Sequence, residues 1–221
     1  MTNQPKHSLE APTVPAAEPD GLIKVADLQS DIVVHLPVWR GAISLDSYQL
    51  LVNGLTIGDP VQLPTPLPDV GSLLTRLIPI ATELMNDGNY SIAYRTISFP
   101  GQNIFDSEMT VIKIDRTAPG AALLAPIIFP NITFGDSLAG LIPGYAGMGR
   151  GDRIQTVCNG VHGPVILVEP ENLTTSLIKI QFDKAFLLSF ETDKLVINYS
   201  ITDRAGNVSI TSKTMELTIN Q

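Results

Sequence analysis

The sequence predicts an all-β protein built from two tandem antiparallel β-sandwiches. The same pattern of residues occurs twice along the chain, at a spacing typical of a small domain and longer than a solenoid unit. Each copy also contains short segments of alternating apolar and polar residues between turns rich in glycine and proline, which is typical of many short strands.

Matching residues define the two copies. One match pairs Pro37, Asp46 and Asn53-Gly54 with Pro143, Asp152 and Asn159-Gly160. A second match, shifted by one position, pairs Ile92, Tyr94, Gly101, Ser107 and Ile114 with Ile197, Tyr199, Gly206, Ser212 and Ile219. We therefore expect one domain over residues 21–117 and a second over residues 118–221. Pro119 lies at this boundary and has no backbone N–H to continue a sheet.

Residues 1–20 precede the first copy. Four prolines occur there among polar and small residues, which predicts a flexible leader.

Strand segments follow from the period-two alternation, as in residues 90–94, where Tyr90, Ile92 and Tyr94 share one face. The other expected strands are 32–38, 48–52, 74–80, 107–114, 123–128, 154–158, 165–168, 175–182, 195–199 and 210–219. The Asn-Gly pairs predict tight hairpin turns, because both residues tolerate a positive φ. Residues 81–85 and 185–190 are expected to form short helical turns at the same place in each copy.

Three motifs extend the fold prediction. They are Asp87-Gly-Asn-Tyr90, Ile114-Asp-Arg-Thr-Ala-Pro119 and Asp203-Arg-Ala-Gly-Asn207. Together they resemble the closing third of bacterial immunoglobulin-like repeats found in large surface adhesins. The first copy departs from the last motif, with Ser98-Phe-Pro-Gly-Gln102, and the second copy lacks the Asp-Gly-x-Tyr opening. The resemblance implies two immunoglobulin-like sandwiches, a non-enzymatic role in adhesion or spacing, and an extracellular or cell-surface location.

Within these motifs, glycines at Gly101 and Gly206 suit positive φ at a hairpin tip. Tyr90 suits a tyrosine corner, in which the hydroxyl bonds nearby backbone.

Composition argues against several classes of partner. The net charge of −8, without any run of Lys or Arg, is unfavourable for nucleic acid or an anionic membrane. No apolar run is long enough for a membrane span, and the first residues lack the pattern of a standard signal peptide. The single cysteine, Cys158, aligns with Val52 and is expected to fill a core position.

The tetrapeptide Gly135-Asp-Ser-Leu138 spells the motif of GDSL hydrolases. In those enzymes the serine needs a histidine from a later Asp-x-x-His element, and the last histidine here is His162, outside any such element. A serine without a base is not a nucleophile, so we interpret Ser137 as the start of a strand.

Candidate binding residues are Trp39, Tyr145, Arg150 and Asp152. Trp39 and Tyr145 occupy the same position of the repeat; exposed, they would form platforms for a sugar or a protein, and buried, they would be core. Their duplication favours the core. Arg150-Gly-Asp152 matches an integrin-type tripeptide, but Asp152 aligns with Asp46, which favours a structural turn.

Calcium is a possible ligand between adjacent repeats, by the same family resemblance. The acidic residues near the loops and the linker are Asp87, Asp106, Asp115, Asp193 and Asp203. They do not form the dense ligand loop that calcium prefers, so solvated loop acids are favoured and no cofactor is expected.

The leading hypothesis is therefore a non-enzymatic tandem module of a bacterial surface or secreted protein, with a protein or glycan ligand or neighbouring repeats as partners. The alternative is a small soluble accessory or carrier protein that binds one protein partner through its loops; an enzyme ranks third. The segments that the copies do not share are 60–70, 160–172 and the leader, and we expect function there.

Overall fold

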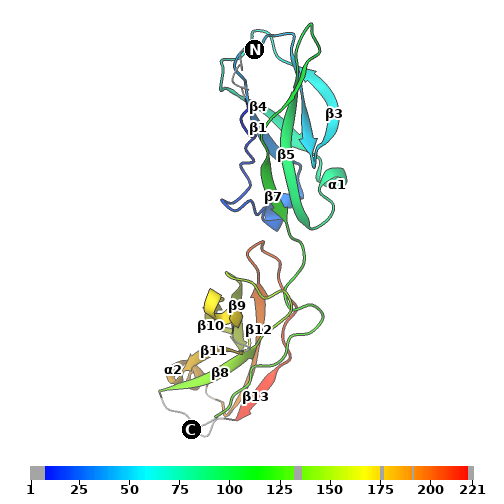
Figure 1. Ribbon diagram of the computed structural model, residues 1–221. Helices are drawn as coiled ribbons and strands as arrows, with labels where there is room; N and C mark the ends of the chain where they lie inside the picture. The colour runs from blue at the N-terminus through cyan, green and yellow to red at the C-terminus, as the bar shows by residue number, and fades with distance from the viewer. Residues whose placement is uncertain (1–7, 132–135, 175–176, 191, 219–221) are drawn as a thin grey trace. The chain divides into compact units, whose positions relative to one another are not determined.

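Figure 1 shows the computed structural model, which describes residues 8–131, 136–174, 177–190 and 192–218 of the 221-residue chain. The chain divides into a first unit, Met1–Arg116, and a second unit, Thr117–Gln221. This division falls one residue before the expected boundary. In both units all pairings between the named strands are antiparallel, which confirms the prediction of an all-β protein with two tandem β-sandwiches.

The first unit packs a two-stranded sheet against a five-stranded sheet (Figure 1). Its elements are the 3₁₀ helix η1 (Val25–Gln29), β1 (Ile32–Pro37), β2 (Ser47–Val52), β3 (Leu55–Gln62), β4 (Leu73–Ile78), α1 (Ile80–Glu83), β5 (Gly88–Ile97), β6 (Ile104–Asp106) and β7 (Thr110–Ile114). Strand β1 pairs with β4, and β5 pairs with β2, β6 and β7. The core lies between the sheets and includes the fully buried Val34, Leu50 and Tyr94.

The second unit repeats this arrangement. Its elements are β8 (Ser137–Pro143), β9 (Arg153–Cys158), β10 (Val161–Leu167), the 3₁₀ helix η2 (Pro170–Thr174), β11 (Leu177–Asp183), α2 (Lys184–Leu188), β12 (Lys194–Thr202) and β13 (Met215–Thr218). One sheet pairs β11 with β8, and the other has the order β10-β9-β12-β13. Ile142, Ile178 and Tyr199 are buried between them, and Cys158 fills its expected core position.

Strand register shows that the duplication extends to individual hydrogen-bonded pairs. Val52 of β2 lies opposite Ile92 of β5, and their equivalents Cys158 and Ile197 lie opposite each other in β9 and β12. Although the offsets of the two sequence matches differ by one position, the matched residues therefore pair in the same register in both units. A one-residue slip would turn every side chain to the other face, so this agreement reflects one shared core pattern.

The Asn-Gly turns adopt the expected conformation. Asn53 and Gly54 both have positive φ, at 51° and 77°, and Asn159 and Gly160 repeat this with 47° and 82°. Two successive positive φ values match the twist of the strands that the turn connects.

Of the two other loop glycines, Gly101 and Gly206, one does not have the expected positive φ. Gly206 has φ of 95°, as predicted, whereas in the first unit Gln102 has the positive φ of 52° and Gly101 does not. The prediction for Gly101 was wrong because the loop after β5 closes through a different bond: Gln102 N–H donates to Ser98 O, while Gly206 N–H donates to Asp203 O. Tyr90 behaves as predicted, since its hydroxyl donates to Asn86 O at 2.8 Å.

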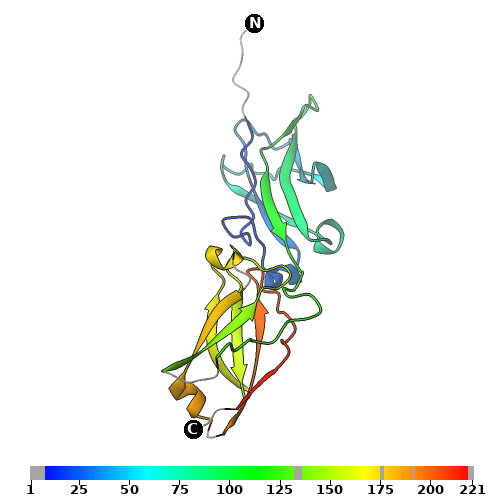
Figure 2. The same ribbon diagram turned by 60° about the horizontal axis from the view of Figure 1, so that its bottom comes forward.

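Residues 8–20 differ from the expected flexible leader. Leu9 forms a bridge with Ser107, Thr13 pairs with His35, and Val14 is buried in the first core. In Figure 2 this dark blue segment runs beside the strands of the first unit, and its continuation at Leu22 pairs with Lys113 of β7. Proline lacks an N–H but leaves its neighbours able to pair, so a proline-rich segment can still cover a sheet edge.

Most other expected elements are present within a few residues, including both helical turns, α1 and α2. Residues 123–128 are an exception: of the expected strand, only Ile128 pairs, in an isolated bridge with Leu141. Strand β3 was not expected because Gly58-Asp-Pro60 interrupts its pattern. These residues form a bulge, which is where a strand accommodates glycine and proline.

Candidate ligand-binding site

A pocket of about 430 Å³ opens at one end of the first unit, within the size range of small-ligand sites. Three segments form it: the N-terminal segment, the residues that end β1, and the loop before β4. Tyr94 of β5 completes the lining. The lining residues are Ser8, Leu9, Glu10, Pro37, Val38, Trp39, Arg40, Val70, Gly71 and Tyr94.

Trp39 supplies the aromatic surface of the pocket, and the fully buried Tyr94 packs against it. Trp39 is half-buried and packs against the first core, and its ring centroid lies 6.4 Å from that of the fully buried Tyr94, with the planes tilted by 34°. The Tyr94 hydroxyl donates a long hydrogen bond of 3.4 Å to Pro37 O. Burial, assisted by the negative charge of Glu10, raises the pKa of Tyr94 to about 12, so this hydroxyl stays protonated at neutral pH.

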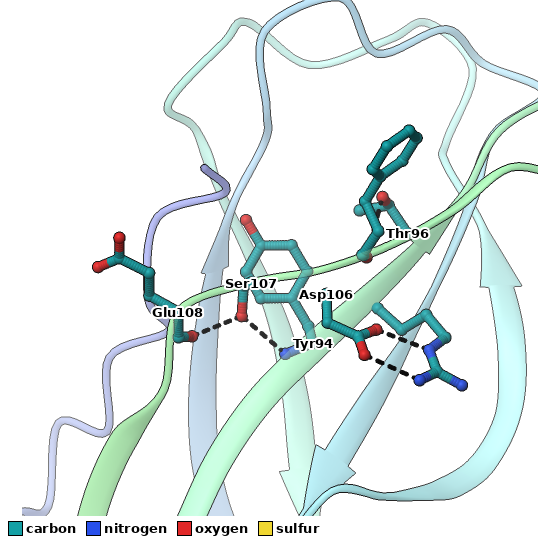
Figure 3. A network of polar contacts seen from close by, with 7 residues as sticks. Tyr94, Thr96, Asp106, Ser107 and Glu108 are labelled. Carbon is teal, nitrogen blue, oxygen red and sulfur yellow. Dashed lines mark hydrogen bonds and ion pairs between the residues drawn. The ribbon is translucent and has the colours of Figure 1, made fainter. Parts of the chain in front are cut away.

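Hydrogen bonds from the strand edge fix Tyr94 (Figure 3). Its backbone N–H donates to Ser107 Oγ at 3.0 Å, and the Ser107 hydroxyl donates onward to Glu108 O at 2.7 Å. In the second unit, Tyr199 N–H donates to Ser212 Oγ at the same distance. These serines therefore hold the fold in both units, and the pocket is built on a rigid strand.

Two opposite charges lie at the pocket. Glu10 and Arg40 are both exposed and belong to segments that the sequence does not bring together. Glu10 is held near the pocket because Glu108 N–H donates to Leu9 O at 3.0 Å, and Ser8 Oγ donates to Glu108 Oε1 at 2.8 Å. The N-terminal segment thus supplies the acidic side of the site.

The equivalent end of the second unit has a different chemistry. Tyr145 is half-buried, and its hydroxyl donates to Asp152 Oδ2 at 2.8 Å. Burial, followed by this hydrogen bond, raises the pKa of Tyr145 above its ordinary value. Gly149 N–H donates to the same carboxylate oxygen at 2.9 Å. The ring of Tyr145 is therefore fixed by its own loop.

Asp46 and Asp152 perform the same structural task. The Asp46 carboxylate accepts from Ile43 N–H at 3.1 Å, as Asp152 accepts from Gly149 N–H, and both aspartates are buried. Asp46 also accepts from Phe99 N–H at 2.9 Å. In the Arg-Gly-Asp tripeptide, Arg150 is exposed but Asp152 has only 3% of its surface accessible, so its carboxylate serves the loop.

The other motifs lie apart from the pocket. Ser137 begins β8 in the two-stranded sheet of the second unit, as its interpretation as a strand start predicted, whereas His162 lies in β10 of the opposite sheet; Gly135 lies outside the described residues. Burial raises the pKa of the Cys158 thiol to about 11, which keeps it protonated.

Several of the acidic residues considered for calcium have protein donors. Asp87 Oδ1 accepts from Arg116 N–H at 2.8 Å, Asp106 forms a two-bond pair with Arg95, and Asp203 Oδ1 accepts from Asn207 N–H. In the described part of the chain, no three His, Cys, Asp or Glu side chains are grouped to hold a metal ion. The expectation of solvated loop acids, with calcium between repeats as the alternative, stays a prediction.

Sequence reasoning found Trp39 but missed Glu10, Arg40 and Tyr94 as site residues. Tyr94 was assigned to the scaffold alone, and it is both scaffold and pocket lining. Residues 8–10 and Val70 of the lining belong to segments that the copies do not share, and the expectation that function lies in those segments stays a prediction.

A set of exposed apolar side chains was also missed. Five large apolar side chains in the loops around Asp46 and after β5 and on β6 are 45–58% exposed: Ile43, Leu45, Phe99, Ile104 and Phe105. Their equivalents in the second unit are Gly149, Gly151, Arg204, Ser209 and Ile210, of which Ile210 is also apolar and exposed. Comparing the two copies position by position would have found the other four differences.

No protein-family model matches the chain, and no curated protein matches it. Among solved structures, the chain is similar to fibronectin(III)-like modules of CbhA from Clostridium thermocellum, with a TM-score of 0.45 and 12% identity over 95% of this chain and 94% of that one. It is also similar to a 1.5-MDa bacterial ice-binding adhesin, with a TM-score of 0.46 and 15% identity over 96% of this chain. The chain spans 64% of that adhesin structure. Among the helices that the structure describes, none has the length and apolar character needed to cross a membrane.

Proposed function

We propose that the chain is a non-enzymatic tandem β-sandwich module of a bacterial surface or secreted protein, which acts in adhesion or spaces and presents a binding surface. The observation that supports this most is that both units use the same polar side chains for the same structural bonds. Asn53 and Asn159 each accept a backbone N–H from the neighbouring strand, at 2.9 and 2.8 Å. Gln49 and Gln155 each donate to the bulge glycine of the next strand.

These bonds explain the polar residues of the scaffold without any reaction. A side chain that is hydrogen-bonded to backbone in both copies meets a need of the sandwich, and a duplicated scaffold leaves binding to the loops it carries. The pocket at Trp39 is the binding surface under this proposal, with a glycan or protein ligand and neighbouring repeats of a longer chain as partners. The proposed location is extracellular or at the cell surface.

Bead retention tests the proposal. Beads coated with the full chain are washed under flow over surfaces that carry host-cell glycoproteins, and the same chain is screened for ester hydrolysis. We expect retention of the beads and no ester hydrolysis above the blank. Ester hydrolysis that Ser137→Ala abolishes would overturn the non-enzymatic assignment.

The second candidate is an accessory protein that binds one protein partner through its loops. The exposed apolar side chains of the first unit favour it, because large apolar residues such as Phe99 are the kind that a protein interface desolvates. The loop-exchange variant Ile43→Gly/Leu45→Gly introduces the glycines of the second unit at these two positions. Loss of one captured partner from native-host extract with this variant, while bead retention is unchanged, would favour this candidate.

A further inference from the structure

The pocket at Trp39 presents both charge signs beside an aromatic wall. Glu10 and Arg40 both line it, together with Trp39, the buried Tyr94 and the apolar Leu9 and Val70. The carboxylate only accepts hydrogen bonds and the guanidinium only donates them, while the Tyr94 hydroxyl is buried and already donates to Pro37 O. The pocket therefore offers donors, acceptors and an apolar surface within about 430 Å³.

This combination limits the charge of the ligand. An anion would gain from Arg40 but would be repelled by Glu10, and a cation would meet the reverse. A purely apolar ligand would desolvate both charges without replacing their bonds to water, which is costly. A neutral ligand with several hydroxyl groups avoids both penalties, because each hydroxyl can donate to the carboxylate or accept from the guanidinium.

The aromatic wall limits the shape of the ligand. Trp39 is half-buried against the fully buried Tyr94, and the part of its ring that stays accessible lines the pocket. An aromatic ring with one wet face suits a ligand that has an apolar face and a polar edge. A pyranose ring has this character, since its C–H groups lie on one face and its hydroxyl groups project from the edge.

We propose that the first-unit pocket binds a neutral saccharide ring, as the terminal sugar of a glycan, with the ring against Trp39 and its hydroxyls between Glu10 and Arg40. The proposal rests on the binding role inferred above and gives it a ligand class. The second unit lacks this site, because Ala146 stands at the position of Arg40 and the Tyr145 hydroxyl is bonded to Asp152.

Trp39 makes the test direct, since it is the chain's single tryptophan and its fluorescence reports this pocket alone. The full chain is titrated with methyl glycosides of glucose, galactose, mannose and N-acetylglucosamine, and separately with glucuronate and glucosamine as charged probes. We expect a saturable change in Trp39 emission with at least one neutral glycoside, at a Kd on the order of 1 mM.

The variants Glu10→Gln and Arg40→Gln alter exposed side chains and each should weaken that Kd by about tenfold, the effect of losing one charged hydrogen bond. Arg150→Gln, an exposed arginine of the second unit, is the matched control and should leave the Kd unchanged. Urea unfolding midpoints equal to the wild type verify that each variant is folded.

Three results would overturn the saccharide assignment: no saturable change with any neutral glycoside, tighter binding of a charged probe, or binding that both pocket variants leave unchanged. Bead retention distinguishes this failure from failure of the proposed function. If the beads are retained on protein surfaces but Trp39 emission does not respond to glycosides, the saccharide proposal is refuted and the adhesion proposal is not. Loss of both would refute the proposed function as well.

Discussion

The Tyr145 hydroxyl donates a hydrogen bond of 2.8 Å to the Asp152 carboxylate, and so closes the loop of the second unit that corresponds to the pocket loop of the first. Trp39 stands at the position of Tyr145 and has no hydroxyl to make this bond. A hydrogen bond to a buried charged group contributes about 1.5–3 kcal/mol. We therefore predict that Tyr145→Phe lowers the unfolding free energy of the second unit by about this amount, as measured by urea denaturation.

Tyr199→Phe is the matched control for this prediction. The Tyr199 hydroxyl donates at 2.9 Å to Ala125 O, a neutral acceptor, so its loss should cost only about 0.5–1.5 kcal/mol. A Tyr145→Phe variant as stable as the wild type would show that the Asp152 loop does not depend on the tyrosine.

Arg76 in the first unit corresponds to the buried Ile180 in the second. We expect the arginine to lower the stability of the first unit. It lies between Leu74 and Ile78 on the inward face of β4, and its Nε is buried with no hydrogen-bond partner in the described part of the chain. A buried donor without a partner costs about 1–3 kcal/mol. Arg76→Ile should therefore raise the unfolding free energy of the first unit by about 1 kcal/mol, measured by thermal and urea unfolding.

Arg95→Ile also removes a positive charge, but from a partly exposed arginine that is paired with Asp106, and it should not stabilise the protein. A destabilising effect of Arg76→Ile would contradict the prediction, because it would mean that the arginine side chain stabilises the first unit despite the lack of a hydrogen-bond partner for its Nε.

The Cys158 thiol should be unreactive in the folded protein. Burial raises the pKa of its thiol to about 11, and the thiolate is the reactive form. We predict no reaction with a thiol-specific disulfide reagent at about pH 8 in buffer and complete reaction in denaturant. Rapid labelling of the native chain would show that the core around β9 opens readily.

The Arg95–Asp106 pair should stabilise the first unit only above acidic pH. The hydrogen bonds from Arg95 lower the pKa of Asp106, so its contribution is fully present above the unfolded pKa of about 3.9 and is lost as pH falls through the lower folded pKa. Both side chains are partly exposed, which limits the pair to about 0.2–1 kcal/mol.

The variant Asp106→Asn measures this contribution. The wild type should be more stable than the variant at neutral pH, and the difference should vanish once the pH falls below the lowered folded pKa of Asp106, where both chains carry a neutral side chain at this position. A difference that persists unchanged at low pH would assign the effect to packing instead of charge.

The sequence was sufficient to predict the fold because the repeat carries period-two alternation and turn chemistry in both copies. Asn53-Gly54 and Asn159-Gly160 occupy turns with positive φ, as local chemistry requires. Tyr90 bonds Asn86 four residues earlier, again a local interaction. These features depend on neighbours in sequence, so a pattern of residues is enough to find them.

The pocket and the N-terminal segment could not be predicted in the same way. Glu10 reaches the site only because Leu9 pairs beside β7, nearly a hundred residues later in the chain, and Arg40 follows the end of β1. No spacing rule connects these positions. For the same reason a proline-rich composition suggested a flexible leader, although Val14 is buried in the core.

Substitution of the pocket charges tests the central claim most directly, namely that the two units share one scaffold and that binding belongs to the pocket of the first. The first-unit variant carries Glu10→Gln and Arg40→Gln, and the second-unit variant carries Arg150→Gln. We predict that both keep cooperative unfolding of both units, while bead retention is lost in the first variant and unchanged in the second. Retention that survives in the first variant, or that depends on Arg150, would contradict the account.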